Sequence, residues 1–143
     1  MNNNNFLFIL SFLLIFFPNK NSFTQSLSSS DAAVYIIEPQ NNETVTNPVK
    51  IKFGIQGMSL SPAGINKELS GHHHLLIDVD NFPDLKKPIP SDKNHLHFGK
   101  GQTETIINLK KGKHTLQLLL GDYLHIPHKT PVYSQKITIY VEN

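Results

Sequence analysis

Short stretches in which apolar and polar residues alternate run through most of the chain. In residues 49–55 every second residue is apolar, and lysine or glycine stands between them. In residues 137–141 isoleucine and valine alternate with threonine and tyrosine. A period of two is typical of a β-strand with one buried face. No segment after residue 32 shows a sustained helical period, so the pattern predicts an all-β fold.

Turn residues separate these stretches about every 10 to 20 positions, which is the spacing of an all-β sandwich. Strands are expected at 33–37, 49–55, 72–79, 103–109, 114–120 and 135–141, with a short segment at 95–98. About seven strands in roughly 110 residues are typical of an immunoglobulin-like antiparallel β-sandwich. We expect this domain to span residues 33–143.

The segment from Gly71 to Asp80 combines three consecutive histidines with a run of large apolar residues. Successive side chains of a strand point to opposite faces. One face, expected to join the core, would carry His73, Leu75, Ile77 and Val79. The opposite face would carry His72, His74, Leu76 and Asp78. His73 is therefore expected to be a buried, hydrogen-bonded ring, and His114, which begins another leucine-rich face, a packing residue.

An apolar segment near the N-terminus predicts export. Phe6 to Phe17 is interrupted only by Ser11. This length suits a signal peptide and falls short of the ~20 residues that a membrane-spanning helix needs. We expect a signal peptide over residues 1–25, cut between Ser22 and Ser30, and a flexible lead-in at 26–32. The mature protein would then be periplasmic or secreted, without a transmembrane helix. The alternative is an uncleaved leader that anchors the protein to the membrane.

The composition excludes several classes of function. The chain has no cysteine, so disulfides, thiolate metal ligands and thiol catalysis are excluded. All 13 basic residues are lysine, and the formal net charge is only +2. Arginine supplies the bidentate contacts that read bases and phosphates, so nucleic acid is not an expected partner. The sequence indicates no particular protein partner.

The histidines are the candidate chemistry. All eight lie between His72 and His128. Neutral imidazole is a good ligand for copper and zinc, and two histidines in a His-x-His pair on a strand point to the same side of a sheet. The candidate metal ligands are His72, His74, His95, His97, His125 and His128. Carboxylates that could orient their rings are Asp78, Glu104 and Asp122.

The candidate ligands can meet only if three loops lie at one end of the sandwich. These loops precede the 72–79 strand, precede Gly99 and follow Asp122. Alternate loops of immunoglobulin-like folds do gather at one end. The first hypothesis is therefore a module that binds copper or zinc.

Two other functions stay open. The histidines could form a hydrogen-bonded network without metal, in an interaction or structural module of the cell envelope. A metal with an open coordination position could instead make a small metallo-enzyme. Catalysis without metal has little support, because no serine stands in a nucleophile-elbow sequence. We therefore favour a binding protein over an enzyme.

Four blocks of sequence resemble a known family. They are GHHHLLID at 71–78, HFGKGQTE at 97–104, HTLQLLLGD at 114–122 and HIPH at 125–128. These blocks resemble the bacterial domain of unknown function 4399 family, whose members are exported, mostly single-domain proteins. The resemblance extends over about residues 49–141. It implies an exported β-domain in which the histidine blocks are the signature, and it implies no particular activity.

Overall fold

The computed structural model describes residues 24–142, in which all regular structure is β-strand. The strands are β1 (Ala33–Glu38), β2 (Glu43–Val45), β3 (Val49–Gln56), β4 (Ser59–Leu60), β5 (Ser70–Ile77), β6 (His95–His97), β7 (Glu104–Ile107), β8 (Gly112–Gly121) and β9 (Ile137–Val141). The predicted signal peptide lies outside the described residues, apart from Thr24 and Gln25. Within the described part of the chain, no helix is long and apolar enough to cross a membrane.

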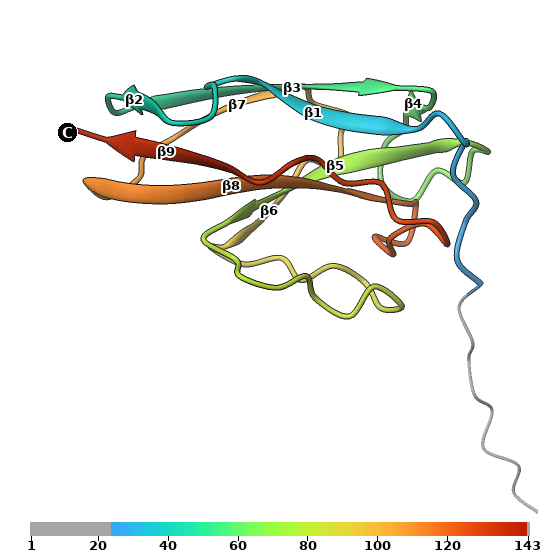
Figure 1. Cartoon of the computed structure of the whole chain (residues 1–143). Coiled ribbons are helices and arrows are strands. Elements are labelled where there is room, and N and C mark those ends of the chain that lie inside the picture. The colour runs from blue at the N-terminus through green and yellow to red at the C-terminus, as the bar shows by residue number, and fades with distance from the viewer. Residues whose placement is uncertain (1–23, 143) are drawn as a thin grey trace, which may run out of the picture.

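The strands form two sheets that face each other (Figure 1). One sheet has the order β1-β3-β7, and the other has the order β2-β9-β8-β5-β4, with β6 also paired to β5. Grouping β1, β3 and β7 against β5, β8 and β9 is the strand division of an immunoglobulin-like sandwich. The predicted all-β sandwich is confirmed, and each predicted strand agrees with the observed one to within two residues at both ends.

Two short strands add parallel pairs to the expected antiparallel sandwich. The short strand β2 pairs with β9 in parallel, and β4 pairs with β5 in parallel. Both are strands of two or three residues at the outer ends of the larger sheet. All pairings among the longer strands are antiparallel, as expected.

The main core fills the space between the sheets and follows the predicted alternation. In β3 the apolar residues at 49, 51 and 53 are buried, while Lys50 is exposed. They meet the inward side chains of β5 and β8, which include Leu75, Ile77, Leu116, Leu118 and Leu120. Burying side chains of this size stabilises the fold by about 1.5–3 kcal/mol each. Burial therefore supports the fold without any disulfide.

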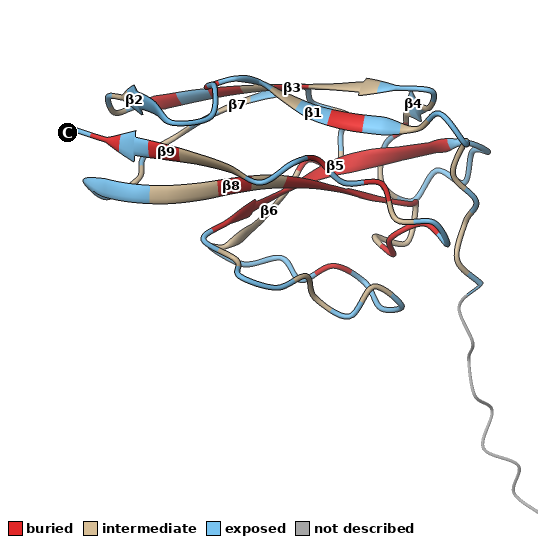
Figure 2. Cartoon of the chain, in the orientation of Figure 1, coloured by how far each residue is buried: buried red, intermediate tan, exposed pale blue. Residues whose placement is uncertain are grey.

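Strand β5 is buried on both of its faces (Figure 2). Leu75 and Ile77 face the main core, as predicted. On the opposite face Leu76 packs with Ile89 and Leu119 in a second apolar cluster. This cluster lies between the sheet and the long connection from β5 to β6, which passes below the sheet in Figure 1. The outer face of β5 is therefore shielded from solvent.

Three loops at one end of the sandwich are joined by backbone hydrogen bonds. The amide of Gly64, between β4 and β5, donates to the carbonyl of Tyr123, after β8, at 2.9 Å. The amide of Ala63 donates to the carbonyl of Gly99, after β6, at 2.9 Å. The loops that carry or flank the histidine blocks therefore meet at one end, which is the condition under which the candidate ligands can meet.

The core predicts a contrast between two apolar substitutions. Leu75 is fully buried, whereas the side chain of Ile106 on β7 is 62% exposed. Leu75→Ala should lower the free energy of unfolding by about 2–5 kcal/mol, because it removes buried atoms and leaves a cavity. Ile106→Ala should lower it by less than about 1 kcal/mol. Urea unfolding followed by circular dichroism measures both, and equal effects would contradict the assigned core.

Candidate metal centre

Four imidazole rings meet beside the outer face of β5. His72 and His74 lie on β5, His97 on β6, and His125 in the loop after β8. The ring centroids of His72, His74 and His97 are 4.9–5.1 Å apart. The His125 ring lies 4.7 Å from that of His97, 5.0 Å from His72 and 6.0 Å from His74. We call these four residues the histidine cluster.

Strand geometry explains why these rings are neighbours. His72 and His74 share a face because side chains alternate along β5. His97 lies directly opposite His74 in the antiparallel β5–β6 pair, so their side chains are adjacent. His72 is paired with Gly121, where β8 ends. The turn that follows brings His125 back over His72, with the His125 amide donating to the Asp122 carbonyl at 2.8 Å.

Two glycines leave room for the cluster. A Cβ atom on Gly121 would lie 2.7 Å from Cε1 of His74 and 3.3 Å from Cα of His125. A Cβ atom on Gly99 would overlap the ring of His97. The sequence indicates only that these glycines are turn residues, and it did not predict that they make room for the imidazoles. Only the placement of the rings in space reveals it.

One ring nitrogen from each of His72, His74 and His97 lies within 4.8 Å of the other two. Zinc–nitrogen bonds are about 2.0–2.1 Å long, so two ligands of a tetrahedral ion are roughly 3.4 Å apart. Small side-chain rotations that move these three nitrogens by about an ångström would bring them to that separation. The three residues could therefore hold a metal ion, with His125 beside them.

Several ring nitrogens of the cluster lack hydrogen bonds to the described part of the chain. Both nitrogens of His72, Nδ1 of His74 and Nε2 of His97 are buried and have no hydrogen-bond partner among the described residues. A buried polar atom without a partner costs about 1–3 kcal/mol, and folded proteins contain few of them. Unpaired nitrogens on three rings that approach one another this closely are a donor set that a metal ion could use.

His72, His74 and His97 are held in their neutral form. Burial, together with the neighbouring His125 and His97, lowers the pKa of His72 to about 4. Burial and the other three rings lower the pKa of His74 to about 2. Burial and His125 also lower the pKa of His97. At neutral pH these rings keep the free lone pair that metal binding requires.

His73 lies on the other face of β5, in the main core. Its ring meets the ring of Phe53 edge-on, at a centroid distance of 4.9 Å. Burial lowers the pKa of His73 to about 4. The predicted burial is confirmed, but the predicted hydrogen bond is not made, because neither ring nitrogen has a partner among the described residues.

Two of the six candidate ligands make other contacts. His95 lies on β6 next to the cluster, but its Nδ1 is 2.8 Å from a carboxylate oxygen of Asp92. His128 is fully buried, and its Nε2 donates to the carbonyl of Ser70 at 3.0 Å. The structure thus brings together four of the six residues, and it places His95 and His128 beside different partners.

Of the three candidate carboxylates, only Asp122 lies at the cluster. It is 1% exposed, and its Oδ1 accepts the amides of Leu124 at 2.8 Å and Ile126 at 3.0 Å. Asp122 thereby shapes the turn that carries His125, rather than contacting a ring directly. This indirect role was not part of the prediction.

The other two carboxylates are engaged elsewhere. Glu104 pairs with Lys50 at 3.2 Å, on the sheet that does not carry the cluster. Asp78 accepts from Nδ1 of His114 at 2.7 Å and from the amide of Thr115 at 2.8 Å. Neither the Glu104 nor the Asp78 carboxylate contacts a ring of the histidine cluster.

His114 forms a separate ionisable contact. Its Nδ1 lies 2.7 Å from the Asp78 carboxylate, and its Nε2 lies 2.7 Å from the carbonyl oxygen of Lys110. Both neighbours are acceptors, so both ring nitrogens donate only in the imidazolium form. Burial alone would lower the pKa of His114, but the two hydrogen bonds and the charge of Asp78 outweigh it and raise the pKa.

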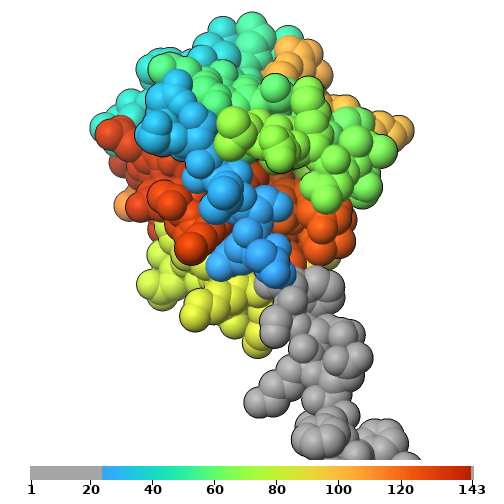
Figure 3. Space-filling model, turned by 90° about the vertical axis from the view of Figure 1, so that its right-hand side faces the viewer, coloured from blue at the N-terminus to red at the C-terminus, as the bar shows by residue number. Residues whose placement is uncertain are grey.

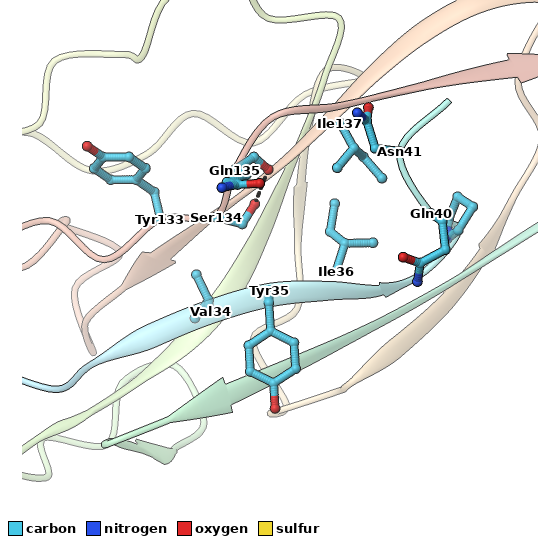
Figure 4. Close-up of a pocket in the computed structure, with 10 residues that line it drawn as sticks. Val34, Tyr35, Ile36, Gln40, Asn41, Tyr133, Ser134, Gln135 and Ile137 are labelled. Carbon is cyan, nitrogen blue, oxygen red and sulfur yellow. Dashed lines mark hydrogen bonds between the residues drawn. The ribbon is translucent and has the colours of Figure 1, made fainter. Parts of the chain in front are cut away.

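A hollow of about 380 Å³ lies on another part of the molecule, between β1 and residues 133–137 (Figure 4). Apolar side chains and amides line most of it, and its lining includes Tyr35 and Tyr133 but no histidine or carboxylate. It therefore offers no set of metal ligands, and the histidine cluster remains the candidate site.

Fold and site together define a class of protein: a small β-sandwich with a buried, all-histidine cluster that could hold a metal ion. The family model described as a domain of unknown function (DUF4399) matches residues 51–142. The chain belongs to this family, and the resemblance seen in its sequence blocks is confirmed. No curated protein and no solved structure matches the chain.

Acid should destabilise the metal-free protein. The folded-state pKa values of His72, His73 and His74 lie below the ordinary value of 6.5. Below pH ~6.5 the unfolded chain therefore binds protons that the folded protein does not, and stability falls until the folded pKa is reached. Between pH 7 and pH 5 the free energy of unfolding should drop by about 2 kcal/mol or more. Urea unfolding of metal-free protein at both pH values measures this, and an unchanged midpoint would contradict it.

His114 should contribute with the opposite sign. Its pKa is raised in the folded protein, so its stabilising contribution is fully present below the unfolded-state pKa and is lost as pH rises through the folded-state pKa. The difference in unfolding free energy between wild type and His114→Gln should be larger at pH 5.5 than at pH 8.5. Urea unfolding at the two pH values measures it, and a difference that grows with pH would refute the assigned ion pair.

Proposed function

We propose that the protein is an exported module that binds a copper or zinc ion through His72, His74 and His97, with His125 as the fourth ligand. One observation carries the proposal. One ring nitrogen from each of His72, His74 and His97, on two strands distant in sequence, lies within 4.8 Å of the other two, and each of these rings has a buried nitrogen without a hydrogen-bond partner among the described residues. A bound ion would supply a partner to one nitrogen of each of these rings.

The donor set supports copper or zinc. All candidate ligands are imidazoles, and the chain has no cysteine that would favour a thiolate-binding metal. Imidazole suits copper and zinc, whereas magnesium and calcium prefer oxygen ligands. Zinc accepts four ligands in a tetrahedral arrangement, which the four rings could provide. Because neutral imidazoles add no negative charge, a buried cuprous ion would cost less desolvation than a divalent ion.

The alternative of a metal-free hydrogen-bonded network has less support. Such a network would join the rings to one another or to the backbone. The ring nitrogens of His72 instead have no partner among residues 24–142, and neither has Nδ1 of His74 or Nε2 of His97. A metallo-enzyme differs in the fourth position, which it would keep open for water or substrate. The placement of the His125 ring beside the other three favours a binding module.

Export is part of the proposal and rests on the sequence. The apolar segment from Phe6 to Phe17 has the length of a signal-peptide core. The resemblance to an exported family points in the same direction. We propose that the mature domain works in the periplasm or outside the cell, where it would meet metal ions directly.

Elemental analysis of untagged protein tests the proposal, since a polyhistidine tag would itself bind metal. Wild type should retain about one copper or zinc ion per chain after dialysis. His97→Ala should weaken binding by more than roughly 100-fold, because even residues that only orient a ligand contribute 10- to 100-fold. His97 is partly exposed, so this variant should fold normally. The double variant His72→Ala, His74→Ala should retain no metal.

His95→Ala is the matched control. This histidine lies on the same short strand as His97, but its ring is bonded to Asp92. The variant should retain metal like wild type. Wild type without copper or zinc, or a His97→Ala variant with wild-type affinity, would refute the proposed site.

A further inference from the structure

We infer that the segment from Thr24 to Ser29 is a strap that holds the His125 turn in place, with Ser26 and Asp122 as the positioning residues. The inference concerns the proposed metal site and rests on that function for its effect on affinity. The sequence predicted a flexible lead-in at 26–32, and residues 24–32 contain no strand. The polar groups of this segment nevertheless form hydrogen bonds with the rest of the domain.

The strap reaches both loops that surround the cluster. The side-chain amide of Gln25 donates to the carbonyl of Leu85 at 2.8 Å and to the carbonyl of Pro127 at 2.9 Å. The amide of Lys129 donates to the carbonyl of Ser26 at 2.9 Å. Figure 3 shows this blue segment lying against the orange-red loop after β8 and extending toward the yellow loop between β5 and β6. Gln25 therefore joins two loops that are distant in sequence.

Asp122 connects the strap to the turn. The hydroxyl of Ser26 donates to Oδ2 of Asp122 at 2.7 Å. The other oxygen of the same carboxylate accepts the amides of Leu124 and Ile126, which flank His125. A buried carboxylate needs several donors, and Ser26 supplies one from outside the turn. The orientation of the carboxylate, and with it the shape of the turn, therefore depends on the strap.

The turn needs this support because its backbone is unusual. His125 has a φ of 66°, in the left-handed region that residues with side chains seldom adopt. Such conformations persist where surrounding contacts hold them. The carbonyl of His125 also accepts the amide of Ile89 at 2.8 Å, which ties the turn to the loop over the second apolar cluster. Ser26, Asp122 and Ile89 together fix the position from which His125 faces the other rings.

The strap also relates leader cleavage to the metal site. A cut before Gln25 would leave all these contacts in the mature protein. A cut after Ser26, within the expected range of Ser22 to Ser30, would remove the bonds of Gln25 and Ser26. We therefore expect mature protein with a complete site to begin at or before Gln25, so that the leader would end before residue 25 rather than at it.

The test compares three single substitutions in the whole untagged protein. Ser26→Ala removes the hydroxyl that reaches Asp122, and Ser26→Thr keeps it. Ser29→Ala is the matched control, because the Ser29 hydroxyl donates to Asp31, two residues further along the chain, and not to the His125 turn. Zinc affinity is measured by competition with a chelator. Hydrogen exchange of the Leu124 and Ile126 amides is measured on metal-free protein, with the β8 core amides as an internal reference.

Ser26→Ala should weaken zinc binding about tenfold, as expected for loss of a group that orients a ligand. It should also speed exchange at Leu124 and Ile126 while the β8 amides stay protected. Ser26→Thr and Ser29→Ala should behave like wild type in both measurements. Unchanged exchange in Ser26→Ala would overturn the strap, and faster exchange with wild-type zinc affinity would overturn its positioning role. Wild type that binds no zinc or copper would overturn the proposed function alone, and the exchange data would still decide whether the strap holds the turn.

Discussion

The burial of β5 on both faces is the constraint on which the rest of the structure depends. Leu75 and Ile77 need the main core on one side, and Leu76 packs in a second apolar cluster on the other. His72 and His74 share the face of Leu76, so the same covering loops remove them from water. Two imidazoles thus lie in a dry environment on what would otherwise be an exposed sheet surface. Their neutrality and their unpaired nitrogens both follow from this burial.

The histidine cluster lowers the stability of the fold locally. Buried polar atoms without partners destabilise a protein, and several occur here side by side. The surrounding structure is nevertheless adapted to them, since Gly99 and Gly121 leave the space that the rings of His97 and His74 occupy. An arrangement that sacrifices stability while preserving geometry is typical of a functional site rather than of a core. The rest of the sandwich has a continuous apolar core that can carry this cost.

The loops at the cluster end are joined to one another by hydrogen bonds and form one connected unit. The β4–β5 connection bonds to the turn after β6 and to the loop after β8, and the N-terminal strap bonds to Asp122 from outside. His125 belongs to this unit, whereas the other three rings lie on paired strands. The site therefore combines three side chains on a rigid sheet with one on a fastened loop. Its geometry depends on contacts between residues about a hundred positions apart.

The alternation of residue types by itself determined the longer strands and the face to which their side chains point, because side-chain direction in a strand is a local property. It also identified the histidine blocks and assigned His73 to the core face. It did not indicate the short strands β2 and β4. Only the tertiary structure decided which imidazoles meet. Strand register decides that His74 lies opposite His97. The closure of a loop after β8 decides that His125 returns over His72. The tertiary structure also placed His128 beside Ser70 and brought the Ser26 hydroxyl to Asp122, contacts between distant residues that no local pattern could have indicated, while His95 instead contacts its near neighbour Asp92.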